Sequence, residues 1–255
     1  MTNYELRMTY PRFWRSLQNK AVIRHLSFVI LLCTTTLLFG QRTIKILYVG
    51  NSLTYSNDMP VMVEEIGKLQ GVTIVSTVLA NPDYALEDHL KAGKVIEELA
   101  SNHYDFLVAQ QGPSARPESQ TNLMEFTQKF SAECKKNKTR LALYMVWPSK
   151  ARSFDFEAVI HSYTNAARRT SSILCPAGRA WLVAWSRDPK LPLYGPDEFH
   201  PSVTGSFLAA MVIYGSLVED NDWSLLGYDK LSVKKDVTEV QFDLLKKSAQ
   251  VTIGH

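Results

Sequence analysis

Three residues of this sequence have the types and the spacing that nucleophilic catalysis requires. Ser52 directly follows an apolar run and lies two residues after Gly50, which permits a sharp turn. Asp197 and His200 are three residues apart, just before an apolar segment. A serine hydroxyl needs a base to take its proton, and a histidine does so best when a carboxylate fixes its tautomer. The three residues therefore predict acyl-transfer chemistry, provided that the fold brings them together.

The segments that must position these residues alternate between strand-like and helix-like patterns. Short apolar or β-branched runs predict strands at residues 44–49, 72–79, 104–109, 141–146 and 173–174. Apolar residues at helical spacing predict helices from about residue 58 and at 86–99, 123–134, 156–169, 202–217 and 237–251. Strands separated by helices pair in parallel through right-handed crossovers. We expect residues 42–255 to form one three-layer α/β domain, with a C-terminal helical extension from about residue 219.

The chemistry-bearing residues fall in loops that such a sheet places at one edge. Gly50–Thr54 follows the first strand, Gln110–Ser114 follows the third, and Asp197–Pro201 precedes a helix. Ligand sites in parallel sheets lie beyond the carboxyl ends of the strands. The topology therefore predicts that the three loops share one site.

These loops resemble the sequence blocks of the SGNH hydrolases, also called GDSL-like lipases and esterases. Gly50–Thr54 is similar to the first block, and Asp197-x-x-His200-Pro201 to the last. GNS and QQGPS in these loops look like an exported bacterial subgroup, and the resemblance covers about residues 43–218. It implies a three-layer α/β/α sandwich with a parallel, flavodoxin-like five-stranded sheet. It also implies that Ser52 is the nucleophile, His200 the base and Asp197 its orienting partner.

The resemblance further implies an oxyanion hole, in which two blocks depart from the family pattern. The backbone N–H of Ser52 is the first implied donor. The second block normally supplies a glycine N–H; residues 81–86 contain no glycine, and Asp83 is the candidate because the preceding proline has no N–H. The third block normally supplies an asparagine side chain. Here Gln110 and Gln111 occupy that loop, and either amide is able to donate.

Charge and composition exclude some classes of function. The chain is 45% hydrophobic and 21% charged, as an ordinary globular protein is. Residues 1–40 contain five basic residues and one acidic residue, which leaves 23 basic and 24 acidic residues elsewhere. Composition therefore gives no indication of a nucleic-acid-binding surface.

Residues 1–41 predict a signal peptide or an N-terminal membrane anchor. Basic residues precede the apolar stretch 26–39, whose length suits the core of a signal peptide better than a membrane span of about 20 residues. Both alternatives place the remaining chain outside the cytoplasm, in contact with a membrane only if the segment is uncleaved. The two cysteines of the exported part, Cys134 and Cys175, are expected either to pair or to remain buried thiols.

Two further groups of residues have a structural and a functional interpretation. Glu87, Asp88 and His89 are of metal-ligating types, but they begin an expected helix, and we interpret them as a solvated first turn with no metal or cofactor. Four aromatic residues either pack in the core or line a sugar-binding cleft. They are Trp147, Trp181, Trp185 and Tyr194.

The sequence thus predicts an exported serine esterase that hydrolyses an acyl ester on a small molecule or a glycan, with glycan O-acetyl groups as a candidate. An α/β-hydrolase is disfavoured, because a second glycine is missing after Ser52 and the acid lies only three residues before the histidine. A non-catalytic envelope or glycan-binding protein on the same scaffold is the alternative, because fold alone does not guarantee activity. The acyl group, the alcohol and the oligomeric state are not specified.

Overall fold

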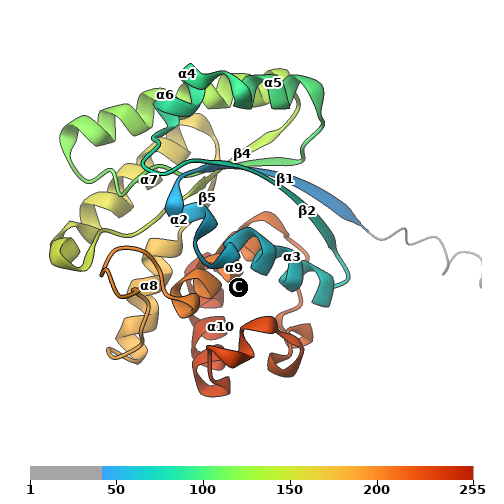
Figure 1. Cartoon of the computed structure of the whole chain (residues 1–255), viewed down its shortest axis with the longest axis vertical. Helices are drawn as coiled ribbons and strands as arrows, with labels where there is room; N and C mark the ends of the chain where they lie inside the picture. Colours follow the sequence, from blue (N-terminus) through green and yellow to red (C-terminus); the bar gives the residue numbers. More distant parts are fainter. Residues whose placement is uncertain (1–41, 255) are drawn as a thin grey trace, which may run out of the picture. The chain divides into compact units, whose positions relative to one another are not determined.

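A five-stranded parallel sheet forms the centre of the structure (Figure 1). The computed structural model describes residues 42–254, and one compact unit begins at Thr43. The segment that we interpret as a signal peptide or anchor lies outside the described residues. Within the described part, no helix is both long and apolar enough to cross a membrane.

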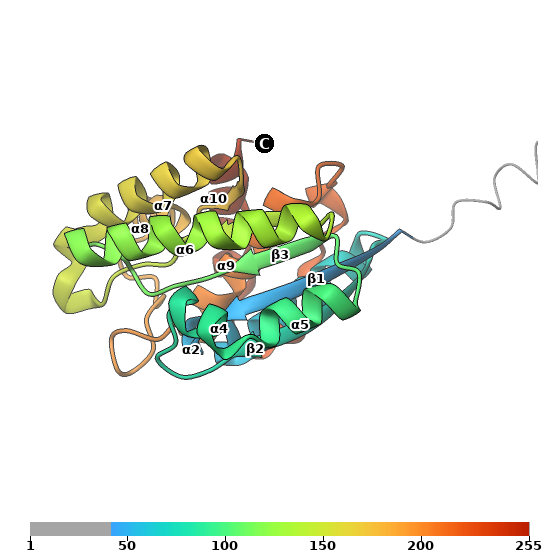
Figure 2. The same cartoon turned by 90° about the horizontal axis from the view of Figure 1, so that it is seen from above.

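The order of the strands confirms the expected sheet. In sequence order the strands are β1 (Thr43–Gly50), β2 (Thr73–Ala80), β3 (Phe106–Ala109), β4 (Arg140–Tyr144) and β5 (Ile173–Cys175). All neighbouring pairs are parallel, and the spatial order is β2-β1-β3-β4-β5, as in flavodoxin-like sheets. Figure 2 shows β1 and β3 running in the same direction, with α2 beyond their carboxyl ends.

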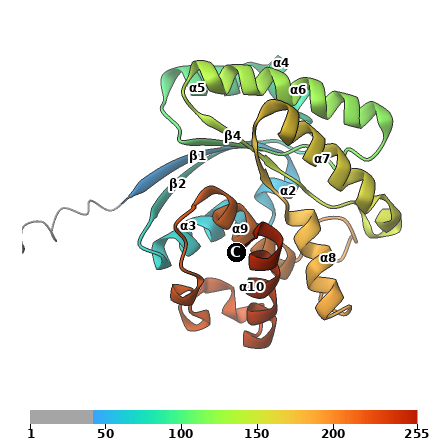
Figure 3. The same ribbon diagram turned by 180° about the vertical axis from the view of Figure 1, so that it is seen from behind.

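Helices cover both faces of this sheet and complete the α/β/α sandwich. One face carries α4 (Leu86–Ala92), α5 (Lys94–Ser101), α6 (Pro117–Lys136) and α7 (Phe156–Thr170) (Figure 1). The opposite face carries α3 (Met59–Leu69), α8 (Ala177–Arg187), α9 (Val203–Leu217) and α10 (Glu239–Ile253) (Figure 3). The central strand β3 is buried along its whole length, which explains its uninterrupted apolar sequence.

Three helices differ from the expected ranges. The segment expected as one helix over 86–99 divides into α4 and α5 at Gly93, whose φ of 75° ends a helix without strain. Helix α6 begins at Pro117, six residues earlier than expected, because its first turns are polar and carry no apolar period. Helix α8 was not expected at all, since its sequence follows a proline and begins with small residues.

Helix α8 starts in close contact with the end of β4. The Gly178 N–H donates to the Met145 carbonyl at 3.0 Å, and a Cβ at residue 178 would lie 2.2 Å from the Val146 carbonyl oxygen. This approach stacks Trp181 on Trp147, with ring centroids 3.6 Å apart. The stacked pair is fully buried and supports the loop that follows β4.

The C-terminal part of the chain is largely helical. Three short 3₁₀ segments, η3 (Trp223–Leu225), η4 (Tyr228–Lys230) and η5 (Ser232–Lys235), lead into α10. Thr238 caps α10 by accepting from the Gln241 N–H. Helix α10 packs against α8 and α9, so this segment belongs to one outer layer of the sandwich.

The two cysteines are separate buried thiols. Cys134 lies on α6 and Cys175 ends β5, and neither forms a disulfide. Burial raises the pKa of both thiols to about 12. Of the two expected alternatives, the structure therefore has the unpaired one.

Candidate active site

The turn after β1 presents Ser52 at the carboxyl edge of the sheet. Asn51 precedes the short helix α2 (Ser52–Tyr55) and caps it, because its Oδ1 accepts from the Leu53 N–H at 3.1 Å. A Cβ at Gly50 would lie 2.3 Å from the Thr54 Oγ1, so only glycine fits there. Ser52 itself is partly exposed.

The predicted acid and base lie together and reach the serine. The carboxylate Oδ2 of Asp197 accepts from His200 Nδ1 at 2.5 Å. With the proton on Nδ1, the free Nε2 accepts from the Ser52 hydroxyl, and the Nε2–Oγ distance is 2.8 Å. Asp197 Oδ1 accepts the backbone N–H groups of Phe199 and His200. The His200 bond and these N–H groups hold the pKa of Asp197 below its usual value.

Contacts from other elements fix the loop that carries Asp197 and His200. The indole N–H of Trp147 donates to the Phe199 carbonyl at 3.1 Å. The hydroxyl of Tyr194 donates to the Pro148 carbonyl at 2.7 Å, so the loop is attached to the segment after β4. Asn57 Nδ2 donates to the Pro201 carbonyl at 2.9 Å. The His200 imidazole is therefore positioned from three sides although it is partly exposed.

Gln110 lies behind the serine turn and does not line the cavity in front of it. Its side chain is fully buried, and its Oε1 accepts both the Asn51 N–H at 2.9 Å and the Thr54 hydroxyl at 2.8 Å. Its Nε2 donates to the Gln111 carbonyl at 2.7 Å. One amide thus connects the serine turn with the loop after β3.

Gln111 takes the other orientation and lines the cavity. Its Oε1 accepts from the Leu86 N–H at 3.2 Å, and its Nε2 donates to the Ser114 hydroxyl at 3.2 Å. An amide nitrogen carries two hydrogens, so one N–H remains for a ligand. The buried hydroxyl of Tyr163 holds the Gln111 backbone, donating to its carbonyl and accepting from its N–H.

The backbone N–H groups of Ser52 and Asp83 have no acceptor within residues 42–254, and both residues line the cavity. Asn51 connects their two loops, because its Nδ2 donates to the Tyr84 carbonyl at 3.0 Å. Asp83 has a φ of 61°, a conformation that aspartate tolerates better than most residues.

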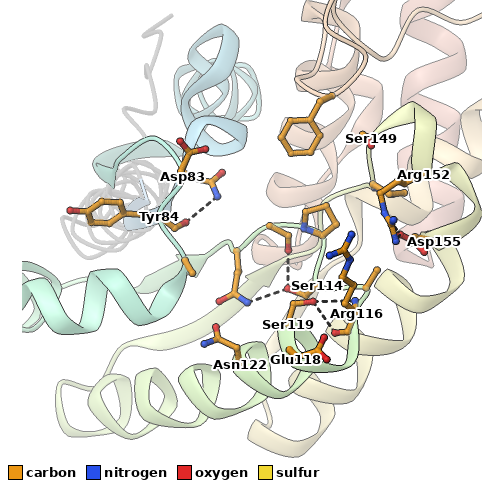
Figure 4. A pocket seen from close by; sticks show the side chains of 18 of the residues that line it. Asp83, Tyr84, Ser114, Arg116, Glu118, Ser119, Asn122, Ser149, Arg152 and Asp155 are labelled. Carbon is orange, nitrogen blue, oxygen red and sulfur yellow. Dashed lines mark hydrogen bonds and ion pairs between the residues drawn. The ribbon is translucent and has the colours of Figure 1, made fainter.

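The cavity in front of Ser52 has a volume of about 830 Å³. Figure 4 shows Asp83 and Tyr84 on one side of it, Arg152 and Asp155 on the opposite side, and the start of α6 between them. Arg152 is held by an ion pair with Asp155. The walls combine charged side chains with prolines and Phe199, a mixture of apolar surface and a few polar groups that is common in ligand sites.

Two of the three residues at the start of α4 have the role expected of them, and His89 does not. Asp88 accepts from the Ala85 N–H, and Glu87 pairs with Lys91, as a solvated first turn would. His89, however, is only 3% exposed, and its Nε2 donates to the Gly50 carbonyl at 2.7 Å. The solvated interpretation is therefore wrong for His89, which supports the end of β1. Within residues 42–254 no three His, Cys, Asp or Glu side chains are grouped to share a metal ion.

The sequence matches no protein-family model and no curated protein. Solved structures do match. A candidate SGNH hydrolase from Slackia heliotrinireducens is 24% identical, with a TM-score of 0.59 over 69% of this chain and 100% of its own. A DUF4886 family protein from Bacteroides uniformis is 17% identical, with a TM-score of 0.69 over 84% and 95%.

A variant of Axe2, an acetyl-xylooligosaccharide esterase from Geobacillus stearothermophilus, is 16% identical, with a TM-score of 0.55 over 72% of this chain and 98% of its own. These similarities agree with the strand order and the layers described above. This chain has the SGNH-hydrolase fold.

Several positioning residues of this SGNH fold were not identified from the sequence. His89 and Tyr163 reach the site from α4 and α7, and Trp147 reaches it from the segment after β4. Each makes a long-range hydrogen bond to a backbone carbonyl. No local sequence pattern reports such a bond, because it depends on how distant elements pack.

We expect Gln110→Met to destabilise the serine turn while preserving the volume of the side chain. The Asn51 N–H and the Thr54 hydroxyl would lose their buried acceptor, and an unsatisfied buried donor costs about 1–3 kcal/mol. Urea unfolding of wild type, Gln110→Met, Thr54→Val and the double variant measures the coupling. Additive losses would contradict a direct interaction.

The burial of His89 predicts a pH-dependent stability. Burial lowers the pKa of His89 in the folded state, whereas the unfolded chain titrates near about 6.5. Below that value the unfolded state binds more protons, so the free energy of unfolding should fall as the pH falls.

The matched variant is His89→Gln, whose amide is able to donate to the Gly50 carbonyl without titrating. Unfolding at about pH 7.5 and about pH 5.5 should show a smaller decrease for the variant than for wild type. An equal decrease in both proteins would show that His89 does not titrate in this way.

Proposed function

We propose that this protein is an exported serine esterase in which Ser52, His200 and Asp197 form a catalytic triad. The observation that carries the proposal is the continuous chain of hydrogen bonds from the serine hydroxyl through the imidazole to the carboxylate. The similarity in fold to a lipase/acylhydrolase from Enterococcus faecalis and to Axe2 supports hydrolysis of an ester. Export rests on the N-terminal sequence alone.

The geometry supports a two-step acyl transfer. His200 Nε2 takes the proton of Ser52 as its Oγ attacks the ester carbonyl carbon, and Asp197 stabilises the imidazolium. Collapse of the tetrahedral intermediate breaks the bond to the alcohol oxygen, which takes the proton from His200. Water then attacks the acyl-enzyme with His200 again as base, and the acid and free serine result.

The oxyanion of the tetrahedral intermediate needs fixed donors. We assign the backbone N–H groups of Ser52 and Asp83 to this role, together with the free amide N–H of Gln111. The first two have no acceptor within the described residues, and all three residues line the cavity. Gln110 is not assigned, because its amide is engaged behind the serine turn. Preorganised donors of this kind contribute a large part of catalysis.

We propose an O-acetylated glycan as the substrate class. Charged and polar side chains at many points of the cavity lining support a hydroxyl-rich alcohol part. Axe2, which shares the fold, is described as an acetyl-xylooligosaccharide esterase. The reaction needs no cofactor.

Replacing Ser52 by alanine should abolish hydrolysis of 4-nitrophenyl acetate, because the covalent route is lost. His200→Ala should be equally damaging, and the double variant should be little worse, since the triad acts as one unit. Asp197→Asn should also reduce kcat strongly, because it disturbs the imidazole tautomer.

Labelling by a fluorophosphonate and mass spectrometry of the modified peptide test the nucleophile directly. Labelling at Ser52, absent in Ser52→Ala, is the expected result. Turnover in Ser52→Ala above about a tenth of wild type would remove Ser52 from its role. A folded wild-type protein that neither labels nor hydrolyses esters would favour a non-catalytic glycan-binding protein on this scaffold.

Gln111→Leu should lower kcat about 10²–10³-fold with little change in KM, as the loss of one oxyanion donor does. The matched comparison is Gln110→Met, which removes a buried acceptor as Gln111→Leu does, but no proposed oxyanion donor, so its loss of kcat should be much smaller. Equal losses of kcat in the two variants would contradict the separate roles assigned to the two amides.

A further inference from the structure

A second cavity, of about 540 Å³, lies against the loop that carries Asp197 and His200. Its lining includes Trp185 from α8, Tyr194 and Glu198 from the loop, and Lys150 and Ser153 from the segment after β4. Neither the proposed triad nor the oxyanion donors line it.

The two aromatic rings of this cavity are held in fixed positions. Trp185 packs edge-to-face against Phe156 and Trp181, and its indole N–H donates to the Leu191 carbonyl at 3.0 Å. The Tyr194 ring lies 5.5 Å from the Trp185 ring, and its hydroxyl is bound to the Pro148 carbonyl. Both side chains are only partly buried, unlike the stacked pair Trp147 and Trp181.

We call the segment 148–155 together with Glu198 and Phe199 of the facing loop the ridge, because residues of both line the two cavities. The segment 148–155 contributes Ser149 and Arg152 to the first cavity and Lys150 and Ser153 to the second. On the facing loop, Phe199 lines the first cavity and Glu198 the second. An ion pair between Lys150 and Glu198 and a backbone bond between the same residues connect the two sides of this ridge.

The second cavity has the features of a sugar-binding site. Its aromatic rings are rigid and partly exposed, and charged donors and acceptors lie at its edge. The axial C–H groups of a pyranose form an apolar face that packs on an aromatic ring, while its hydroxyls bind groups such as the Lys150 ammonium and the Glu198 carboxylate. A preorganised ring loses little entropy when a ligand binds. A longer ligand lying over the ridge would occupy both cavities at once.

We propose that the second cavity is a sugar-binding subsite, in which Trp185 and Tyr194 pack against a pyranose of the same glycan chain whose ester lies at Ser52. The proposal rests on the proposed function, because it takes the ester at Ser52 to be the group that reacts. Binding energy from such a remote unit contributes to kcat/KM for a glycan and not for a short ester. The enzyme would therefore act on oligomeric or polymeric substrates.

The test compares kcat/KM for acetylated xylotetraose and cellotetraose with kcat/KM for 4-nitrophenyl acetate. In Trp185→Ala, the ratio of the tetrasaccharide value to the aryl acetate value should fall about tenfold. Ser153→Trp should have the same effect by filling the cavity, and it changes only an exposed side chain. Val240→Ala is the control, because Val240 on α10 is 79% exposed and lines neither cavity; its ratio should equal that of wild type.

An unchanged ratio in folded Ser153→Trp and Trp185→Ala would overturn the subsite. If wild type hydrolyses none of these esters, the proposed function fails, and the subsite is then tested by calorimetry with unacetylated xylotetraose and cellotetraose on Ser52→Ala. Binding that is lost on adding Ser153→Trp supports the subsite. No binding of either tetrasaccharide, or binding unaffected by Ser153→Trp, overturns it.

Discussion

The side-chain amide of Gln110 is the interaction on which the geometry of the site depends. Its oxygen accepts from the Asn51 N–H and the Thr54 hydroxyl, and its nitrogen donates to the Gln111 carbonyl. The first two bonds set the turn that presents the serine, and the third sets the loop after β3. Because the amide is fully buried, none of these bonds competes with water. The amide that lines the cavity is therefore that of the next residue, Gln111.

Positioning of the site continues outward from this amide through backbone carbonyls. His89 binds the Gly50 carbonyl, Tyr163 binds the Gln111 carbonyl, and Trp147 binds the Phe199 carbonyl. His89 thus holds the end of β1, and Tyr163 and Trp147 each hold a loop that has no regular structure of its own. The result is a rigid backbone around a reactive group that remains partly exposed. This arrangement is expected where helices and strands form a rigid scaffold and the loops carry the functional residues.

The sequence predicts the sheet, most helices and the three residues that the structure joins by hydrogen bonds. Those features have local signals: apolar runs for β1 and β3, and an Asp-x-x-His spacing short enough for one turn. The roles of Gln110 and Gln111 could not be separated, because adjacent amides have the same chemistry and only packing decides which one is buried. His89 looked like part of a solvated turn for a similar reason: its burial depends on β1, which is distant in sequence. Helix α8 was missed because it follows a proline and its first residues are small, as the close contact of Gly178 with Val146 requires.

The free state of Cys134 and Cys175 has a practical consequence for this molecule. Both thiols are buried, on different elements, and burial disfavours the reactive thiolate form of each. The fold that begins at Thr43 therefore needs no oxidant for its completion. A form that lacks residues 1–41 is expected to reach the same structure in a reducing cytoplasm, where proteins that depend on disulfides fail to mature. The same thiols should be inert toward alkylating reagents until the chain unfolds, so they report global opening of the domain.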